Sequence, residues 1–151
     1  MKRQCGTCTK CCEGYLSGSA FGKSFYNGRP CHFLSIGKGC TVYAKRPNDP
    51  CQIYKCAWLE DEEIPEWMKP ENINALVDYT SIDNIPYIRV TEAGEVLHSK
   101  VISWLIIHAL NKNLNLSWQV EGGQNYIGSA EFLQAMQNRR DASLAAHQTS
   151  I

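Results

Sequence analysis

The stretch Cys5-Gly-Thr-Cys8-Thr-Lys-Cys11-Cys12 places four thiols within eight residues near the N-terminus. Two residues separate Cys5 from Cys8, and two more separate Cys8 from Cys11. Cysteines at this spacing can direct their sulfurs at one centre from a single turn of backbone, as metal knuckles do. The same spacing begins the cysteine run that holds a [4Fe–4S] cluster in bacterial ferredoxins. The stretch therefore predicts a metal centre around which the first part of the chain folds.

The other four cysteines follow at wider intervals, and all eight precede Leu59 in the chain of 151 residues. In a secreted protein such a density would predict disulfides, whereas in a reducing cytoplasm it predicts metal ligands. Because the basic start of the chain lacks the apolar segment of a signal peptide, we expect a cytoplasmic protein. The predicted metal ligands are Cys5, Cys8, Cys11, Cys12, Cys31, Cys40, Cys51 and Cys56.

The formal net charge of zero hides a strong division of charge along the chain. Residues 1–59 carry nine basic and two acidic residues, and residues 60–151 carry six basic and thirteen acidic residues. Bound thiolates leave negative charge around a metal, so the excess of +7 in the first part fits a metal site. Aromatic residues among these basic ones leave a nucleic-acid surface as an alternative. We consider nucleic acid the less favoured partner, because metal-bound thiolates would cancel most of that positive charge.

Residues Cys5–Leu59 resemble the YkgJ-type cysteine-cluster family, which is described as a zinc- or iron-chelating domain. The resemblance lies in Cys5-x2-Cys8-x2-Cys11-Cys12, Cys31-His-Phe-Leu, Gly39-Cys40-Thr-Val-Tyr43-x2-Arg46-Pro47 and Cys51-x4-Cys56. The chain departs from the family pattern in the three residues 48–50 between Pro47 and Cys51. The resemblance implies that all eight cysteines bind metal. Members include a flagellin lysine N-methylase and proteins described as iron–sulfur oxidoreductases, but most have no assigned reaction.

Iron–sulfur clusters and zinc both accept ligand sets made of cysteine alone. The ferredoxin-like spacing favours an iron–sulfur cluster, and the lack of a second regular Cys-x2-Cys pair weakens the case for twin zinc ribbons. Adjacent side chains such as those of Cys11 and Cys12 point to opposite sides of extended backbone. The two cysteines could therefore bind two different centres, or one could be a ligand while the other stays a free thiol. In a third arrangement, one of them packs as a small apolar side chain. We assign Arg46 and Tyr43 to the cofactor site, Arg46 beside a thiolate or fixing a turn and Tyr43 as an aromatic over the metal.

The sequence predicts an α+β protein: an irregular, metal-stabilised, cysteine-rich half packed with a small antiparallel sheet and two to three helices. We expect one compact domain made of a cysteine-rich region at 1–59, an acidic and proline-containing seam at 60–70, and an α+β half at 71–151. Helical turns are expected at 9–13, 41–46 and 50–58, around an irregular loop at 13–30. Beyond the seam we expect helices at 70–79, 97–110 and from Ser129 onward, strands at 87–90, 114–120 and 126–127, and a hairpin-like turn at 92–95.

Several function classes find little support in the sequence. No apolar run approaches the ~20 residues that span a bilayer, so no membrane contact is expected. No two titratable residues have the spacing of an acid/base pair. His108, on an apolar helix, is expected to be a histidine of the core. The acidic run Glu60–Glu63 is expected to form a solvent-exposed face or a site for a basic partner. The resulting hypothesis is a metal-binding protein with an unknown protein or small-molecule partner and no assigned catalytic residues. The alternative is an iron–sulfur-dependent redox or group-transfer (methylase-like) enzyme.

Overall fold

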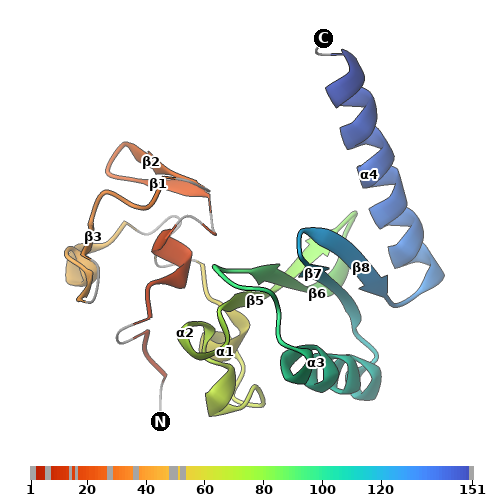
Figure 1. Ribbon diagram of the computed structural model, residues 1–151, viewed down its shortest axis with the longest axis horizontal. Coiled ribbons are helices and arrows are strands. Elements are labelled where there is room, and N and C mark those ends of the chain that lie inside the picture. Colours follow the sequence, from red (N-terminus) through yellow and green to blue (C-terminus); the bar gives the residue numbers. More distant parts are fainter. Residues whose placement is uncertain are drawn as a thin grey trace.

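The computed structural model describes residues 3–5, 8–13, 15, 17–26, 29–35, 38–47, 51 and 54–149. A four-stranded sheet with a helix on each face forms the C-terminal half, and the cysteine-rich segments lie beside its edge strand β5 (Figure 1). This combination of helices and sheets confirms the predicted α+β class. No helix among the described residues is long and apolar enough to cross a membrane.

The sheet has the strand order β5-β6-β7-β8. Strands β5 (Ala75–Ile82) and β6 (Ile85–Glu92) form an antiparallel hairpin. Its two turn residues, Asp83 and Asn84, have φ angles of 48° and 64°. Two consecutive positive φ angles identify the turn type that matches the natural twist of a hairpin, and Asp and Asn adopt them more readily than most residues.

The sheet is mixed, which corrects the prediction of an antiparallel sheet. Helix α3 (Ser99–Lys112) crosses over from β6 to β7 (Asn115–Val120), and a crossover of this kind makes the two strands parallel. Strand β8 (Gly123–Ile127) then returns antiparallel to β7. The expected hairpin at 92–95 is wrong for the same reason, because this segment leads from β6 into the crossover helix.

The helix predicted over 70–79 is also wrong beyond its first turn. Helix α2 spans only Pro70–Ile73 and ends at Asn74, whose φ of 50° is left-handed. The residues that follow belong to β5, where Val77 pairs with Val90 of β6. The apolar residues of this stretch fit a short helical face or a strand, and pairing with β6 selects the strand.

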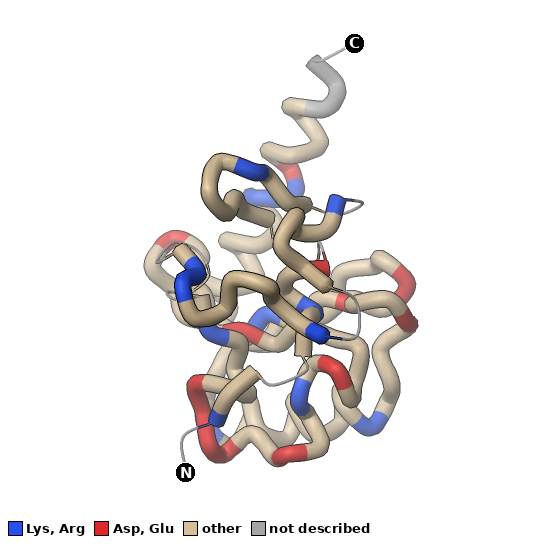
Figure 2. Tube along the Cα trace, turned by 90° about the vertical axis from the view of Figure 1, so that its left-hand side faces the viewer, with Lys and Arg blue, Asp and Glu red and all other residues tan. Residues whose placement is uncertain are grey.

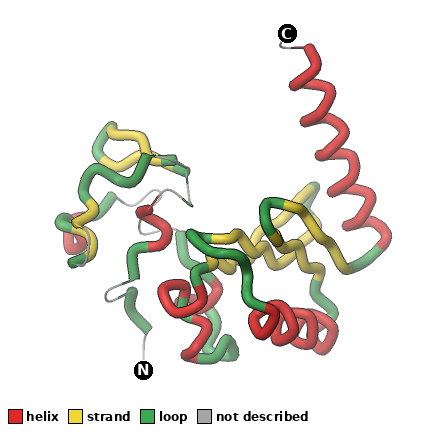
Figure 3. Tube along the Cα trace, in the orientation of Figure 1, coloured by secondary structure: helices red, strands yellow, loops and turns green. Residues whose placement is uncertain are grey.

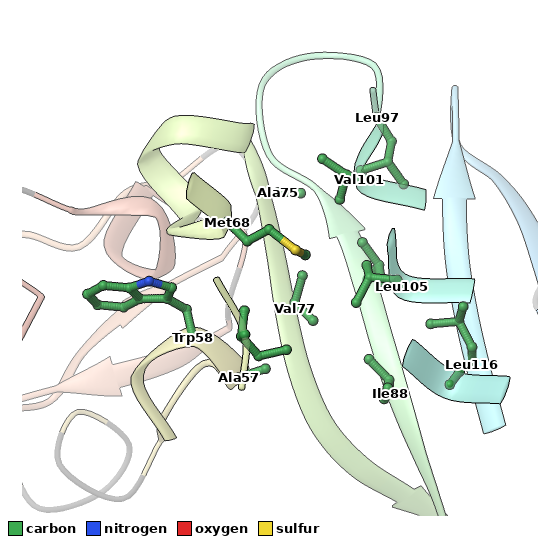
Figure 4. Close-up of a cluster of buried hydrophobic side chains, with 13 residues drawn as sticks. Ala57, Trp58, Met68, Ala75, Val77, Ile88, Leu97, Val101, Leu105 and Leu116 are labelled. Carbon is green, nitrogen blue, oxygen red and sulfur yellow. The ribbon is translucent and has the colours of Figure 1, made fainter. Parts of the chain in front are cut away.

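Helix α3 and the segment before β5 cover one face of the sheet. Val77, Ile88 and Leu116 of three strands meet Leu105 of α3 in the main core (Figure 4). Helix α4 (Ala130–Thr149) covers the opposite face with its first turns, where Phe132 is fully buried, and its C-terminal part projects away from the sheet (Figure 1). The side chain of Ser129 accepts a hydrogen bond from the backbone N–H of Phe132, as the predicted helix start requires.

Loops make up most of the cysteine-rich region (Figure 3). The predicted irregular loop at 13–30 contains a short hairpin, and the predicted helical turns at 9–13 and 41–46 are confirmed as 3-10 turns. In the expected turn at 50–58, helix begins only at Ala57, while residues 50, 52 and 53 lie outside the described residues. The elements before β5 are η1 (Lys10–Glu13), β1 (Gly18–Ala20), β2 (Lys23–Phe25), β3 (Leu34–Ser35), β4 (Gly39–Cys40), η2 (Tyr43–Lys45), α1 (Ala57–Glu60) and η4 (Glu66–Met68).

Two sets of polar contacts join the cysteine-rich region to the rest of the chain. The Arg3 guanidinium donates to the carbonyl oxygens of Trp58 at 2.6 Å and Ile64 at 2.8 Å. The Tyr54 hydroxyl donates to Asp78 of β5 at 3.2 Å, and Asp78 also accepts two hydrogen bonds from Arg89 of β6. These contacts fix the start of the chain and the segment around Tyr54, just before Cys56, to the segments that follow them.

Candidate metal centre

A single cavity of about 130 Å³ lies within the cysteine-rich region, against the start of the sheet half. Apolar side chains such as Phe25, Phe33 and Leu76 form much of its wall. The structure brings every predicted ligand to this cavity. The cysteines that line it are Cys5, Cys8, Cys11, Cys12, Cys31, Cys40, Cys51 and Cys56.

The backbone around the cavity holds distant cysteines next to one another. The N–H of Cys8 donates to the carbonyl of Cys5 at 2.9 Å, which closes a tight turn at the start of the chain. The N–H of Cys31 donates to the carbonyl of Cys12 at 2.7 Å, which joins two segments nineteen residues apart in the sequence. Cys56 is the residue immediately before helix α1 and is placed by that helix.

Backbone N–H groups point at several of the sulfurs. The Cys8 sulfur accepts from the N–H groups of Lys10 and Glu71. The Cys56 sulfur accepts from those of Leu59 and Trp58. Burial raises the pKa of both thiols, to about 11 for Cys56, and these N–H groups act in the opposite direction by favouring the thiolate. Because the thiolate is the metal-binding form, the same N–H groups would stabilise a bound thiolate.

The pattern repeats at a third cysteine. The sulfur of Cys31 accepts from the N–H of Phe33, two residues further along the chain. Lys10 and Trp58 stand in the same relation to Cys8 and Cys56. Three separate segments thus fold the backbone so that the N–H two residues beyond a cysteine turns back to its sulfur.

The sulfurs fall into two groups according to which of them act on one another. Burial is the main cause that raises the pKa of Cys56, and negative charge on Cys5 and Cys8 raises it further. Cys5 and Cys8 also act on Cys11, so these four make one group. Burial likewise raises the pKa of Cys51, with further contributions from the second group, Cys12, Cys31 and Cys40.

Cys11 and Cys12 stand where the two groups meet. Their sulfurs are 3.8 Å apart, and a thiol–thiolate hydrogen bond between them raises the pKa of Cys11 and lowers that of Cys12. Cys12 packs with Cys31 and Cys51 in a small apolar cluster around Phe25. Cys12 therefore acts on Cys11 more strongly than Cys5 and Cys8 do, and the two neighbouring cysteines link the groups.

The sulfurs surround the cavity without closing on a common point. Among the described residues, no three cysteine sulfurs lie within 4.8 Å of one another. A tetrahedral zinc site with Zn–S bonds of ~2.3 Å would bring its sulfurs to about 3.8 Å from one another. Metal binding would therefore draw the thiol segments inward and reduce the cavity.

Arg46 and Tyr43, which the sequence analysis assigned to the cofactor site, both line the cavity. The Arg46 guanidinium stacks over the Tyr43 ring at 4.0 Å and donates to the Tyr43 carbonyl at 2.9 Å. Its Nε also donates to the carbonyl of Cys51 at 3.4 Å. Arg46 thus links the carbonyls of Tyr43 and Cys51, and its positive charge favours the Cys51 thiolate.

Trp58 is a site residue that the sequence analysis missed. Its side chain is 5% exposed and lines the cavity (Figure 4), and its indole Nε1 is buried with no hydrogen-bond partner among the described residues. The cations of Arg3 and Lys69 lie 4.8 Å and 5.2 Å from the centre of its rings. A buried N–H donor without a partner is unfavourable, and a thiolate sulfur in the cavity would supply an acceptor.

Basic side chains accompany the thiols, as the charge division predicts. Arg46, Lys55 and Lys69 line the cavity, and Lys69 also pairs with Glu71 at 2.9 Å. Lys and Arg positions are spread over the segments of this region that face the viewer in Figure 2. These cations would offset the charge of bound thiolates.

Comparison of the chain with family models, with curated proteins and with solved structures found no match. The family resemblance therefore rests on the cysteine motif alone, and the chemistry of the site has to be argued from its geometry.

Proposed function

We propose that this chain is a metal-binding protein whose eight cysteines form two four-thiolate centres. Cys5, Cys8, Cys11 and Cys56 would make one centre, and Cys12, Cys31, Cys40 and Cys51 the other. The observation that carries the proposal is the convergence of all eight thiols, from five separate stretches of chain, on one cavity. An apolar core has no need of eight thiols in contact with one cavity, whereas two tetrahedral metal sites require that number.

The residues around the thiols suit bound metal. Backbone N–H groups already point at the sulfurs of Cys8, Cys31 and Cys56, and hydrogen bonds of this kind stabilise metal-bound thiolates. The unpartnered indole N–H of Trp58 supplies a further donor in the cavity wall. Four thiolates around a divalent ion carry a net charge of −2, which the cations lining the cavity would offset.

Iron–sulfur clusters and zinc remain the two candidates for the bound group. The Cys-x2-Cys-x2-Cys spacing and the apolar cavity wall favour iron–sulfur clusters, because burial protects a cluster from solvent and sets its potential. Four-cysteine groups fit zinc equally well, and zinc would give the region a purely structural centre. The YkgJ-type resemblance supports metal binding and leaves both candidates open.

Purification without oxygen, followed by elemental analysis and visible absorption, tests the proposal. We expect either two zinc ions per chain in a colourless protein, or iron with matching sulfide in a brown one. Metal-poor protein in which all eight thiols are reduced and titratable, and which takes up no metal on reconstitution, would contradict it.

Single cysteine variants test the division into two centres. Cys40→Ser and Cys56→Ser belong to different groups, so each should lose about half of the metal, and the double variant should lose nearly all of it. Ser81→Ala, at an exposed position of β5, is the control and should retain the full content. Loss of all metal from either single variant would instead indicate one shared centre.

A further inference from the structure

A second group of metal-ligating side chains lies outside the cysteine cavity. Asp61 and Glu63 follow helix α1, and His108 lies near the end of helix α3. One ligand atom from each of the three residues lies within 4.8 Å of the other two. The sequence gives no signal for this group, because more than forty residues separate the carboxylates from the histidine.

His108 is the unusual member of the group. Its side chain is 9% exposed and stacks on Trp104 with ring centroids 4.7 Å apart. In the part of the chain that the structure describes, neither of its ring nitrogens makes a hydrogen bond. Its ring nitrogens are not fully buried, so the imidazole can offer a lone pair to an ion held beside the two carboxylates.

The Asp61 carboxylate is already held in place. The Tyr79 hydroxyl donates to its Oδ2, and the backbone N–H of Glu63 donates to its Oδ1 at 2.9 Å. Burial by itself would raise the pKa of Asp61, but these two hydrogen bonds and nearby positive charge outweigh it and lower the pKa. Hydrogen bonds from neighbouring groups orient ligands in the same way at metal sites.

A cation already occupies the open side of the group. Lys112 Nζ lies 2.9 Å from Glu63 Oε1 and 2.8 Å from Glu63 Oε2, and both side chains are about half exposed. Exposed ion pairs of this kind contribute little to stability, so a divalent ion could displace the ammonium group.

We propose that Asp61, Glu63 and His108 bind a first-row divalent metal ion at a site separate from the cysteine cavity. One imidazole nitrogen and two carboxylate oxygens suit Mn²⁺, Fe²⁺ or Zn²⁺, and the absence of thiols distinguishes this site chemically from the cysteine centres. Water would complete the coordination on the exposed side, where Lys112 now lies. The thiolate centres and the Asp61, Glu63 and His108 site differ enough in metal preference for one molecule to hold different metals at these two sites.

Titration with Mn²⁺ of the protein purified without oxygen, after a weak chelator has removed loosely bound metal, tests the proposal, because Mn²⁺ prefers oxygen and nitrogen ligands and competes poorly for thiolates. The electron paramagnetic resonance signal of free Mn²⁺ reports how much ion remains unbound. We expect one Mn²⁺ bound per chain. Absence of binding up to millimolar Mn²⁺ would overturn the proposal.

Variants at exposed positions keep the test independent of folding. Glu63→Gln removes a ligand and should weaken Mn²⁺ binding by about tenfold or more. Glu62→Gln removes the same charge from the exposed neighbouring residue and should leave binding nearly unchanged. Lys112→Met removes the competing cation and should tighten binding.

The pattern of these variants separates a metal site from a surface ion pair. Glu63→Gln and Lys112→Met both break the same ion pair, so a purely structural pair predicts changes in the same direction. A metal site predicts opposite changes in Mn²⁺ affinity. Equal effects of Glu62→Gln and Glu63→Gln, or weaker binding in Lys112→Met, would overturn the assignment. His108→Gln, measured at a temperature where circular dichroism shows it folded, should lose binding.

Discussion

The cysteine-rich region and the sheet half differ in what holds them together. Among the described residues, the main core of thirteen buried residues is made mostly by the sheet half and the segment before it, with Ala57 and Trp58 from the end of the cysteine-rich region, whereas the cluster around Phe25 has three buried residues, Ala20, Phe25 and Cys31. Regular elements dominate the sheet half, and loops dominate the region around the thiols (Figure 3). Because apolar burial among the described residues is concentrated in the sheet half, we expect the cysteine-rich region to depend on metal ligation to offset the entropy of ordering its loops.

Removal of metal should have the largest effect and the most unequal one. We expect chelation under reducing conditions to abolish amide-exchange protection in β1 to β4 and to leave it in β5 to β8, because only the latter rest on an apolar core. Hydrogen exchange followed by mass spectrometry measures both regions in one experiment. Re-addition of metal should restore protection, and equal loss in both regions would show that the two unfold as one unit.

Truncation of the main core should give the reverse contrast. Leu105 of α3 is fully buried, so Leu105→Ala should lower the free energy of unfolding of the sheet half by ~2–5 kcal/mol. Urea denaturation monitored by circular dichroism measures this change. Leu110→Ala, on the same helix but 65% exposed, is the control and should change stability by less than ~0.5 kcal/mol. Similar losses in both variants would contradict the assigned core.

The sequence predicts the parts of the fold in which one local pattern dominates. Helix α3 and strand β7 carry clear helical and alternating patterns, and both are found where expected. Strand β5 was missed, since Leu76, Val77 and Tyr79 fit either a short helical face or a strand, and only the pairing with β6 decides. The mixed sheet could not be predicted either, because the direction of β7 relative to β6 depends on how α3 crosses the sheet.

The same distinction applies to the candidate sites. The eight cysteines could be named from the sequence, because their residue type and spacing carry the chemistry. Trp58 could not, since its place in the cavity wall and the burial of its indole N–H depend on the fold. The Asp61, Glu63 and His108 group was interpreted as a solvated acidic run and a core histidine, because only the packing of α3 against the segment after α1 brings them together.

Alkaline pH should separate the metal-free protein from the loaded one. Cys56 packs against the main core at the start of α1, which we expect to stay folded without metal, and burial there raises its pKa from 9.0 to about 11, so the metal-free protein favours the neutral thiol. The stability from this preference is complete below pH 9 and is lost as the pH rises towards 11. Metal-bound thiolates are already deprotonated, so the loaded protein should instead lose stability in acid, where protons compete with metal. Thermal unfolding of both forms across pH measures the two directions.

Cys56→Ala provides the control for that pH dependence. The metal-free variant should lose part of the decline between pH 9 and 11, because the residue that resists ionisation is gone. An unchanged decline would assign the effect to the other buried thiols, whose pKa values are also raised.

The smallest predicted effect concerns the joint between the two regions. Arg3 reaches the carbonyls of Trp58 and Ile64 and pairs with Glu66 at 3.1 Å. Arg3→Gln should therefore lower stability by ~1–2 kcal/mol, since charged hydrogen bonds to backbone contribute about that much. Hydrogen exchange should show the loss at residues 57–66 and not in β6 or β7.

Arg3→Lys is the informative companion variant. It keeps the positive charge beside Trp58 but lacks the planar fork that reaches several carbonyls at once. If the joint depends on the fork, Arg3→Lys should resemble Arg3→Gln in exchange at residues 57–66. If it depends on charge beside the indole, Arg3→Lys should instead resemble the unmodified protein. Equal exchange in all three proteins would show that other contacts, such as the Tyr54 hydrogen bond to Asp78, and not Arg3, hold the cysteine-rich region against the sheet.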